Sequence, residues 1–387
     1  MKKRGNGEGS VFEIRPGYYR GQVTIGRAAD GKLKRKSVYG STKKEVKDKI
    51  AQIRMDLNLG TYVEETNITV YAFTKSLLDN DRSLGVVRET TYHRHICELR
   101  VIEQHGIGMI PLQKCTKVHL NTFFSELTGY SDSTISKVFG LVRRCFREAY
   151  REKLIKEDIT LYLKKPKSTA AKVKTRALTI PEQKKLFDVL KENETIPYRS
   201  QMLLMLSTGM RMGEINALDY DDVDFRFNII NIHRTCSRGA DHDRTIISEN
   251  PKTAAGNRKI RMTKQTVNIL YEYLLQRQDN PLNLLFYDDK AGKVITTSQV
   301  NMQLQRIFDK YQIIDEKIPG KVSLHSLRHT YATRCIESGM SAKVLQEILG
   351  HTDVRITLNT YTDAFEEFQS ENIKLVEAYY DKLNISI

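Results

Sequence analysis

The sequence contains no apolar run long enough to span a membrane. It also lacks the pattern of a secretory signal, because Met1 is followed by Lys2, Lys3 and Arg4 and then by polar residues. No internal repeat and no low-complexity tract is present. We therefore expect a soluble, cytoplasmic protein, and the length of 387 residues predicts two or three domains.

Cysteine is scarce, and its pattern excludes two common uses. The five cysteines are odd in number, widely separated and never arranged as CxxC, which argues against a disulfide framework and against a zinc ribbon. We expect all of them to be reduced and to act as small apolar side chains. They are Cys97, Cys115, Cys145, Cys236 and Cys335.

Acidic residues are outnumbered by basic ones, and the formal net charge is +15. A basic soluble protein most often meets nucleic acid, and a membrane surface or an acidic partner is the rarer alternative. The excess is uneven, since residues 1–62 hold 15 basic and 6 acidic residues, whereas residues 362–387 hold 6 acidic residues and 2 lysines. The N-terminal part is therefore suited to a polyanion, and the C-terminal tail is not.

Residues 1–65 are predicted to form a small α+β domain, a three-stranded sheet plus one helix. Alternating apolar residues and turn signals indicate strands at 11–14, 18–25 and 34–39, and a capped apolar pattern indicates a helix over 42–53. We expect one face of this sheet to present cations to a DNA backbone or groove, with a solvated basic surface as the alternative. The expected cations are Arg20, Lys34 and Lys36.

Residues 66–165 have a helical pattern throughout, and residues 166–176 read as a basic linker with a Pro and no acidic residue. A helical bundle with basic outer faces suits a protein that surrounds a duplex, although a solvated face or tether explains each segment nearly as well. The candidate phosphate contacts are Arg94, Arg143 and Arg144 on the helices, and Lys172 and Lys174 in the linker.

Residues 177–387 are predicted to be mainly helical with a small antiparallel sheet. The helical pattern runs from a cap at Thr179 to about residue 206, strand-like runs follow at 228–232, 245–247 and 258–262, and the remaining pattern is helical to the end.

The stretch 349–361 is the strongest local signal of chemistry. A helix ends at Gly350, His351 follows at once, and Tyr361 comes ten positions after the histidine. A phenol has a pKa of about 10, so it acts as a nucleophile only where cations stabilise the developing charge. The sequence therefore raises the question of which cations surround Tyr361.

Three other segments supply candidate cations. Arg211 begins a helix where Glu214 can orient it, and Lys252 lies at the tip of a predicted hairpin. His325 and Arg328 share a helix face. The alternatives are an ordinary Arg–Glu surface pair, an exposed hairpin lysine and, for the histidines, a zinc site.

A zinc site would combine His325 and His329 with His351. It is disfavoured because no Glu stands between the first two histidines and because Arg328 on the same face repels a dication.

Taken together, these segments resemble the active site of the tyrosine recombinases, the phage integrase family. The order and spacing of the motifs match over residues 207–361. The match includes Arg211 in Thr-Gly-x-Arg-x-x-Glu, Lys252 in Pro-Lys-Thr, His325-x-x-Arg328, Leu-Gly-His351 and Tyr361. The resemblance implies a catalytic domain over 177–387, a helical core-site-binding domain over 66–165 and an arm-site-binding domain over 1–65.

The chain departs from the common pattern of the family at two points. Many family members place the Tyr nine residues after the His, whereas the ten-residue spacing here is similar to that of integrases from Gram-positive conjugative transposons and prophages. Many also have a His two residues after the Tyr, where this chain has Asp363. Tyr379 and Tyr380 are alternative nucleophiles on sequence alone, but their acidic, amphipathic surroundings favour packing.

The resemblance implies a reaction without a metal or other cofactor. Tyr361 would attack a DNA phosphodiester to give a 3′-phosphotyrosyl bond, with Arg211 and Arg328 on the non-bridging oxygens. Lys252 would protonate the leaving oxygen, His325 would assist proton transfer and His351 would hydrogen-bond the phosphate. The implied partners are double-stranded DNA at core and arm sites, three further protomers in a synaptic tetramer, and an excisionase or DNA-bending protein.

Two other functions remain open from the residues alone. A type IB topoisomerase uses the same residue types, and a catalytically silent DNA-binding regulator would share the basic domains. The separate basic N-terminal domain favours recombination over the former, and the full set of polar site residues argues against the latter. The tail after Tyr361 is expected to dock on a neighbouring protomer, with packing on its own domain as the alternative.

Overall fold

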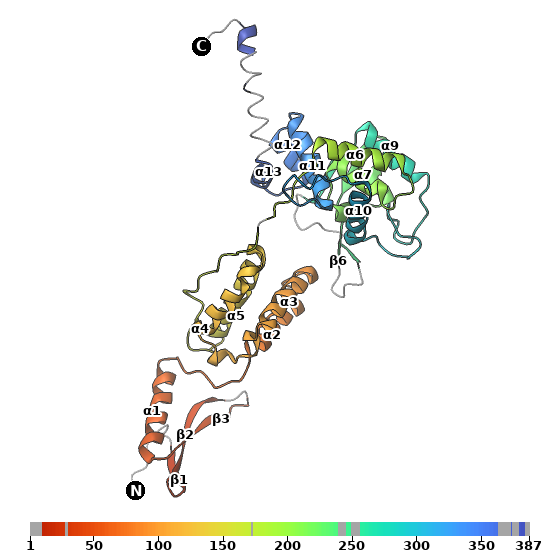
Figure 1. Cartoon of the computed structure of the whole chain (residues 1–387). Helices are drawn as coiled ribbons and strands as arrows, with labels where there is room; N and C mark the ends of the chain where they lie inside the picture. The colour runs from red at the N-terminus through yellow and green to blue at the C-terminus, as the bar shows by residue number, and fades with distance from the viewer. Residues whose placement is uncertain are drawn as a thin grey trace. The chain divides into compact units, whose positions relative to one another are not determined.

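The computed structural model describes residues 10–27, 30–171, 173–238, 245–248, 256–362, 373 and 379–383. The chain divides into two compact units, Met1–Ala171 and Lys172–Ile387, which are described separately (Figure 1). The division falls within the stretch 166–176 that the sequence marks as a linker. None of the described helices is both long enough and apolar enough to cross a membrane.

The first unit begins with a three-stranded antiparallel sheet in the order β1-β2-β3, followed by helix α1. The helix starts because the Thr42 side chain accepts a hydrogen bond from the Glu45 N–H at 3.1 Å. Gly21 in β2 lets this helix approach closely, since a Cβ there would lie 2.6 Å from Val46 Cγ1. The elements are β1 (Ser10–Arg15), β2 (Tyr18–Arg27), β3 (Leu33–Gly40) and α1 (Lys43–Asn58).

The rest of the first unit is helical, and its core is an apolar cluster to which all four long helices contribute. A bidentate ion pair joins two of these helices, with Arg144 Nη1 and Nη2 2.5 and 2.8 Å from the carboxylate oxygens of the buried Asp81. The helices are α2 (Val70–Ser83), α3 (Glu89–Gln104), α4 (Lys117–Glu126) and α5 (Asp132–Arg151).

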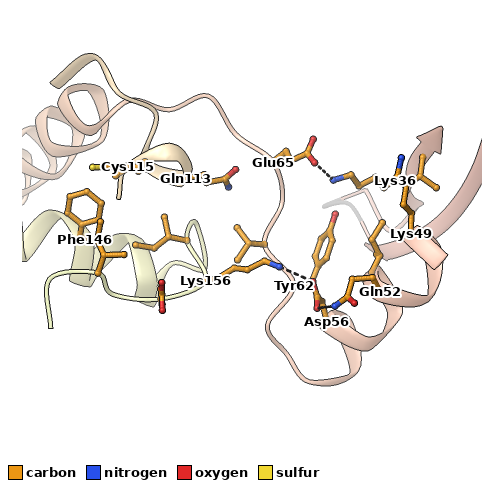
Figure 2. Close-up of a pocket in the computed structure, with 17 residues that line it drawn as sticks. Lys36, Lys49, Gln52, Asp56, Tyr62, Glu65, Gln113, Cys115, Phe146 and Lys156 are labelled. Atoms are coloured by element: carbon orange, nitrogen blue, oxygen red, sulfur yellow. Dashed lines mark hydrogen bonds and ion pairs between the residues drawn. The ribbon is translucent and has the colours of Figure 1, made fainter. Parts of the chain in front are cut away.

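A cavity of about 610 Å³ lies where the sheet and α1 meet the helical part of this unit. Figure 2 shows two ion pairs at its wall, Lys156 with Asp56 at 3.1 Å and Lys36 with Glu65 at 3.0 Å. Tyr62 stands between them in this view. An acidic residue of α1 therefore pairs with a lysine of the helical part, and an acidic residue of the segment after α1 pairs with a lysine of the sheet.

The second unit is built from helices around one large apolar cluster. Helix α6 begins with a full capping box, in which the side chains of Thr179 and Glu182 each bind the other's backbone N–H, and Pro181 occupies the first turn. The helices are α6 (Ile180–Glu192), α7 (Arg199–Thr208), α8 (Met212–Ile215), α9 (Lys264–Leu274), α10 (Thr297–Tyr311), α11 (Leu324–Glu337), α12 (Ala342–Leu349) and α13 (Val354–Thr360).

The strands of the second unit form two small antiparallel sheets, ordered β4-β5-β8 and β6-β7. Three strands coincide with the predicted runs, whereas two were not anticipated. The former are β5 (Ile229–Ile232), β7 (Thr245–Ser248) and β8 (Arg258–Arg261), and the latter are β4 (Val223–Asp224) and β6 (Thr235–Arg238).

The expectation of helix from these strands to the end of the chain is wrong for residues 276–296. This stretch is irregular, and its backbone pairs only through the isolated bridges Asp219–Leu284 and Asp288–Lys293. One proline, one glycine and several Asn and Asp residues lie within it, and these favour turns.

A second, smaller apolar cluster lies among α11, α12 and α13, which stand together in Figure 1. It contains Leu345 and Leu349 of α12, Cys335 and Ile336 of α11, and Tyr361 directly after α13. This cluster brings the stretch 349–361 against the helix that contains His325 and Arg328.

Candidate active site

The turn between α7 and α8 places Arg211. Gly209 ends α7 in the left-handed region with φ +65°, and a Cβ there would lie 2.4 Å from Cδ1 of Tyr331. Arg211 Nη1 donates to Glu214 Oε1 at 2.8 Å, and Arg211 Nη2 reaches the Gly350 carbonyl at 3.4 Å. The Arg211 side chain is 42% exposed, so its guanidinium is both held and accessible.

Arg328 on α11 is almost completely buried, with 1% of its surface exposed. Its Nη1 donates to the Gly209 carbonyl at 2.8 Å and its Nη2 to the Leu349 carbonyl at 2.7 Å. Burial and the neighbouring Arg211 lower the pKa of Arg328 to about 9. The two candidate arginines are thus attached to consecutive carbonyls at the end of α12.

The position of His351 is set by the end of α12, where Gly350 adopts φ +65° and the His351 N–H bonds back to the Gln346 carbonyl at 3.1 Å. His351 Nε2 lies 3.0 Å from Arg328 Nη2, and Nδ1 lies 2.8 Å from Thr357 Oγ1. A guanidinium can only donate, so Nε2 accepts and the proton resides on Nδ1. Burial and Arg328 lower the pKa of His351 to about 4, which keeps the ring neutral at pH 7.

His325 and His329 lie one turn apart on α11 and meet edge to face, with ring centroids 4.7 Å apart. The ring of His329 also contacts that of Tyr361 at 5.5 Å. Desolvation by the surrounding chain lowers the pKa of both imidazoles, that of His329 to about 4, and Arg328 adds to each shift. Among the described residues, no three His, Cys, Asp or Glu side chains are grouped so as to hold a metal ion.

Tyr361 is 6% exposed and belongs to the small apolar cluster. Burial raises its pKa to about 12, although Arg328 and Arg211 act in the opposite direction. The phenol is therefore fully protonated at neutral pH. The candidate cations Arg328 and Arg211 are close enough to act on the phenol, but its ring is packed away from water.

Arg258 is a residue of this site that sequence reasoning missed. It lies at the start of β8, and its Nη1 and Nη2 donate to both oxygens of Glu214 at 3.0 and 2.7 Å. Exposure alternates along β8, where Ile260 is buried and Lys259 and Arg261 are exposed. The period-two pattern of the strand was the available signal, because it places Arg258 on the same side as the buried Ile260.

Lys252, predicted at the tip of the hairpin before β8, lies outside the described residues, as does Lys172. The other helix and linker candidates differ in their surroundings. Arg94 and Arg143 are exposed on α3 and α5, and Lys174 is exposed in the linker. The guanidinium of Arg144 is engaged by the buried Asp81, which favours a role in holding α2 to α5.

The expectation that Arg20, Lys34 and Lys36 share one sheet face is wrong. Arg20 pairs directly with Phe12 on β1 and with Tyr39 on β3, and its guanidinium lies 5.9 and 6.0 Å from those rings. Lys34 and Lys36 have the parity of Val38, which is buried against α1, so they belong to the opposite face.

Both lysines of that second face are already paired with acidic residues of the segment after α1. Lys34 Nζ lies 2.5 Å from Glu64, and Lys36 Nζ lies 3.0 Å from Glu65.

Comparison with known proteins agrees with this geometry. A Tyrosine recombinase XerC-like protein of Caldanaerobacter subterraneus subsp. tengcongensis is 27% identical over 369 residues, which cover 89% of this chain and 92% of that protein. The transposase from transposon Tn916 of Enterococcus faecalis is 24% identical over 340 residues, which cover 85% of this chain and 83% of that transposase.

A solved structure of the Tn1549 transposon integrase, in complex with transposon right end DNA, has the same fold. The TM-score is 0.67 at 23% identity, over 80% of this chain and 99% of that one. Residues 176–367 match the Phage integrase family. The fold expected from the sequence is therefore confirmed, and residues 176–367 belong to the phage integrase family of tyrosine site-specific recombinases.

Proposed function

We propose that this recombinase integrates and excises a mobile element by cutting and rejoining DNA through a 3′-phosphotyrosyl intermediate on Tyr361. One observation supports this above all. Arg211 and Arg328, from distant segments, are fixed on the adjacent carbonyls of Gly350 and Leu349, beside His351 and within electrostatic reach of Tyr361. Fixed cations beside a phenol are what a tyrosine needs to attack a phosphodiester.

The two arginines would hold the non-bridging oxygens of the scissile phosphate. Arg211 is accessible from solvent, so it meets the phosphate first. Without DNA, His351 Nε2 accepts a hydrogen bond from Nη2 of Arg328. An arriving phosphate oxygen is a stronger, charged acceptor for that N–H. His351 would then bind the phosphate only after it gains a proton on Nε2.

The proposed step begins when the oxygen of Tyr361 attacks phosphorus and the bond from phosphorus to the 5′-oxygen breaks. The phenolic proton passes to His325, which is neutral because its pKa is lowered by desolvation and by Arg328 and Arg211. Lys252 gives a proton to the leaving 5′-oxygen. Attack by a 5′-hydroxyl on the phosphotyrosine reverses the step and joins the strand, without a metal or other cofactor.

Because burial raises the pKa of Tyr361 to about 12, we propose that the structure shows this residue in its resting, unreactive position. The reaction needs its oxygen in line with the phosphate held by Arg211 and Arg328, so we propose that DNA binding releases the ring from the α11–α12 cluster. Residues 363–372, directly after the nucleophile, lie outside the described part of the chain. The proposal that this tail docks on a neighbouring protomer rests on the sequence alone.

The wider assembly follows from the chemistry of exchange. Two duplexes have four strands to cut, which calls for four protomers on double-stranded DNA. We propose that the open sheet face around Arg20 binds arm sites and that Arg94, Arg143 and Lys174 follow the backbone at core sites. An excisionase or DNA-bending protein and a cytoplasmic, nucleoid-associated location complete the proposal.

The test is Tyr361→Phe on a nicked suicide substrate that traps covalent protein–DNA. We expect the variant to bind DNA as the parent does and to form no covalent product, because the nucleophilic oxygen is gone. Tyr379→Phe and Tyr380→Phe are matched controls, since both side chains are exposed and both were alternatives on sequence. Covalent product from Tyr361→Phe refutes the assignment.

Two assays on the unchanged chain separate the other functions. Strand exchange between two cognate sites identifies a recombinase, whereas relaxation of any supercoiled plasmid without exchange identifies a topoisomerase. Binding with no trapped product on any substrate identifies a regulator.

A further inference from the structure

The C-terminal end of α12 is held by three arginines from three separate parts of the chain. Arg258 Nε donates to the Ile348 carbonyl at 2.6 Å, Arg328 Nη2 to the Leu349 carbonyl at 2.7 Å, and Arg211 Nη2 to the Gly350 carbonyl at 3.4 Å. The last carbonyls of a helix have no partner inside the helix and carry a partial negative charge, so cations stabilise them.

Arg211 and Arg328 are accounted for by the proposed reaction, but Arg258 is not. Its side chain is only 7% exposed, and its other donors point to protein acceptors. Both Nη1 and Nη2 are bound to the Glu214 carboxylate, which already supplies the negative charge that a phosphate would bring, whereas Arg328 gives an N–H only to carbonyls and to the neutral His351. We propose that Arg258 is a positioning residue for DNA cleavage, which fixes Arg211 through Glu214 and fixes His351 through the end of α12. The inference rests on the proposed function, because it concerns how the phosphate clamp is held.

Arg258 is linked to Arg211 through the carboxylate of Glu214, which accepts hydrogen bonds from both arginines. Glu214 is 6% exposed, and its two oxygens accept the backbone N–H and Nη1 of Arg211 as well as Nη1 and Nη2 of Arg258. Four donors fix the plane of the carboxylate, and that plane fixes the guanidinium of Arg211 at its exposed edge. Without Arg258, half of these bonds are lost and Glu214 is free to turn.

Charge gives Arg258 a second effect on Arg211. Burial alone would raise the pKa of Glu214, but its hydrogen bonds and the charges of Arg258 and Arg211 lower it to about 2, so it is ionised. A buried carboxylate paired with Arg211 alone would cancel the charge that a phosphate should meet. Arg258 balances Glu214, and the positive charge of Arg211 remains available for the substrate.

The link to His351 runs through the backbone. Arg258 holds the Ile348 carbonyl, three residues before His351, and strand β8 is thereby tied to the turn that carries this histidine. A single side chain thus connects the supports of two proposed catalytic groups, Arg211 and His351.

The experiment compares Arg258→Gln and Arg258→Lys with Arg261→Gln in the full-length protein. Arg261 is the matched control, because it is an arginine on the same strand with an exposed side chain. DNA affinity is measured by titration, and the rate of covalent-complex formation is measured at saturating DNA. We expect Arg258→Gln to slow the covalent step about 100-fold with affinity changed by less than about 3-fold, since the loss concerns orientation and charge at the reacting phosphate. Arg261→Gln should leave the rate unchanged.

A second substrate separates positioning from a merely structural role. It carries a methylphosphonate at the scissile position and so lacks one negative oxygen. If Arg258 keeps the charge of Arg211 available, the defect of Arg258→Gln should shrink about 10-fold on this substrate, because the transition state has less charge to stabilise. Equal defects on both substrates, or an unchanged rate on the phosphate, would overturn the inference.

Folding is controlled with the double variant Glu214→Gln/Arg258→Gln, which removes both buried charges at once. It should unfold near the parent's melting temperature while the slow covalent step remains on the phosphate substrate. A double variant that folds and cleaves at the parent's rate also overturns the inference. Failure of the proposed function is distinguishable, because then the parent itself gives no covalent product, or Tyr361→Phe does.

Discussion

At the scale of single residues, backbone carbonyls position the candidate site. Arg328 could not be buried as a charge without acceptors, and it finds them in the carbonyls of Gly209 and Leu349. Both carbonyls are available because each lies at a helix end with a glycine in the left-handed region, Gly209 after α7 and Gly350 after α12. These glycines therefore support the proposed phosphate clamp as well as the fold.

Gly209→Ala tests that dependence. The added Cβ meets a strained φ of +65° and lies 2.4 Å from the Tyr331 ring and 3.0 Å from the Leu349 side chain. We expect the free energy of unfolding to fall by about 2–4 kcal/mol, from backbone strain and overpacking together, as measured by denaturant titration. Cleavage should fall as well, because the acceptor of Arg328 moves. Gly140→Ala in α5, where nothing lies within 4 Å, should not destabilise. A neutral Gly209→Ala contradicts this account.

The histidines predict a pH dependence of stability. The pKa values of His329 and His351 are about 4 in the folded chain, below the value of about 6.5 expected when unfolded. Between these values the unfolded chain binds more protons, so stability is fully present above pH 6.5 and is lost as the pH falls toward 4. The melting temperature of the parent should drop more between pH 7.5 and pH 5 than that of His329→Gln/His351→Gln. Equal drops would show that these two rings do not titrate as described.

At the scale of elements, the N-terminal sheet shows why the sequence does not reveal which residues of different strands share a sheet face. Within β3, alternation puts Lys34, Lys36 and Val38 on one side, and Val38 packs under α1. The register of β2 against β3 then decides which residues join them, and it places Arg20 opposite Tyr39 on the other side. Alternation along one strand shows which of its residues share a face, but the register between neighbouring strands cannot be derived from it.

This arrangement sharpens the prediction for arm-site binding. Arg20→Ala and Arg35→Ala should weaken binding to an arm-site duplex and should each reduce the salt slope of log K by about 1, as expected for lost phosphate contacts. Arg35 has the open-face parity of Tyr39 and is exposed. Lys34→Ala should change affinity much less, since its ammonium already binds Glu64 at 2.5 Å. A larger loss in Lys34→Ala would place the DNA on the other face.

At the scale of the whole molecule, the chain consists of two compact units, and the basic excess is concentrated toward one end. Core and arm duplexes would meet different cations if the proposed function holds. The salt dependence of binding counts the phosphates that a protein neutralises.

We therefore expect a steeper salt slope on DNA that carries both arm and core sites than on core DNA alone. The measurement is an affinity titration of the full chain over about 0.05–0.3 M salt, in which each further phosphate contact adds about 0.9 to the slope. The control is a duplex of equal length with a scrambled arm sequence. Equal slopes on all three duplexes would mean that the N-terminal region makes no phosphate contacts of its own.

The sequence by itself determined the family, the order of the elements apart from β4, β6 and the irregular stretch 276–296, and the identities of Arg211, His325, Arg328, His351 and Tyr361 as candidates. Capping residues, period-two and helical patterns and left-handed glycines act over a few residues, so they can be read locally. Spacing between motifs then pointed to one chemistry.

Only the tertiary structure decided which contacts the residues of those motifs make. The burial of Tyr361 against His329, the neutral His351 bound to Arg328, and the meeting of three arginines on Ile348, Leu349 and Gly350 all depend on helices and a strand far apart in the chain. In the sequence Arg258 is one basic residue among many, because the carboxylate that it binds lies 44 positions away. Side-chain charge is encoded locally, but the partners that fix and neutralise it are set by packing.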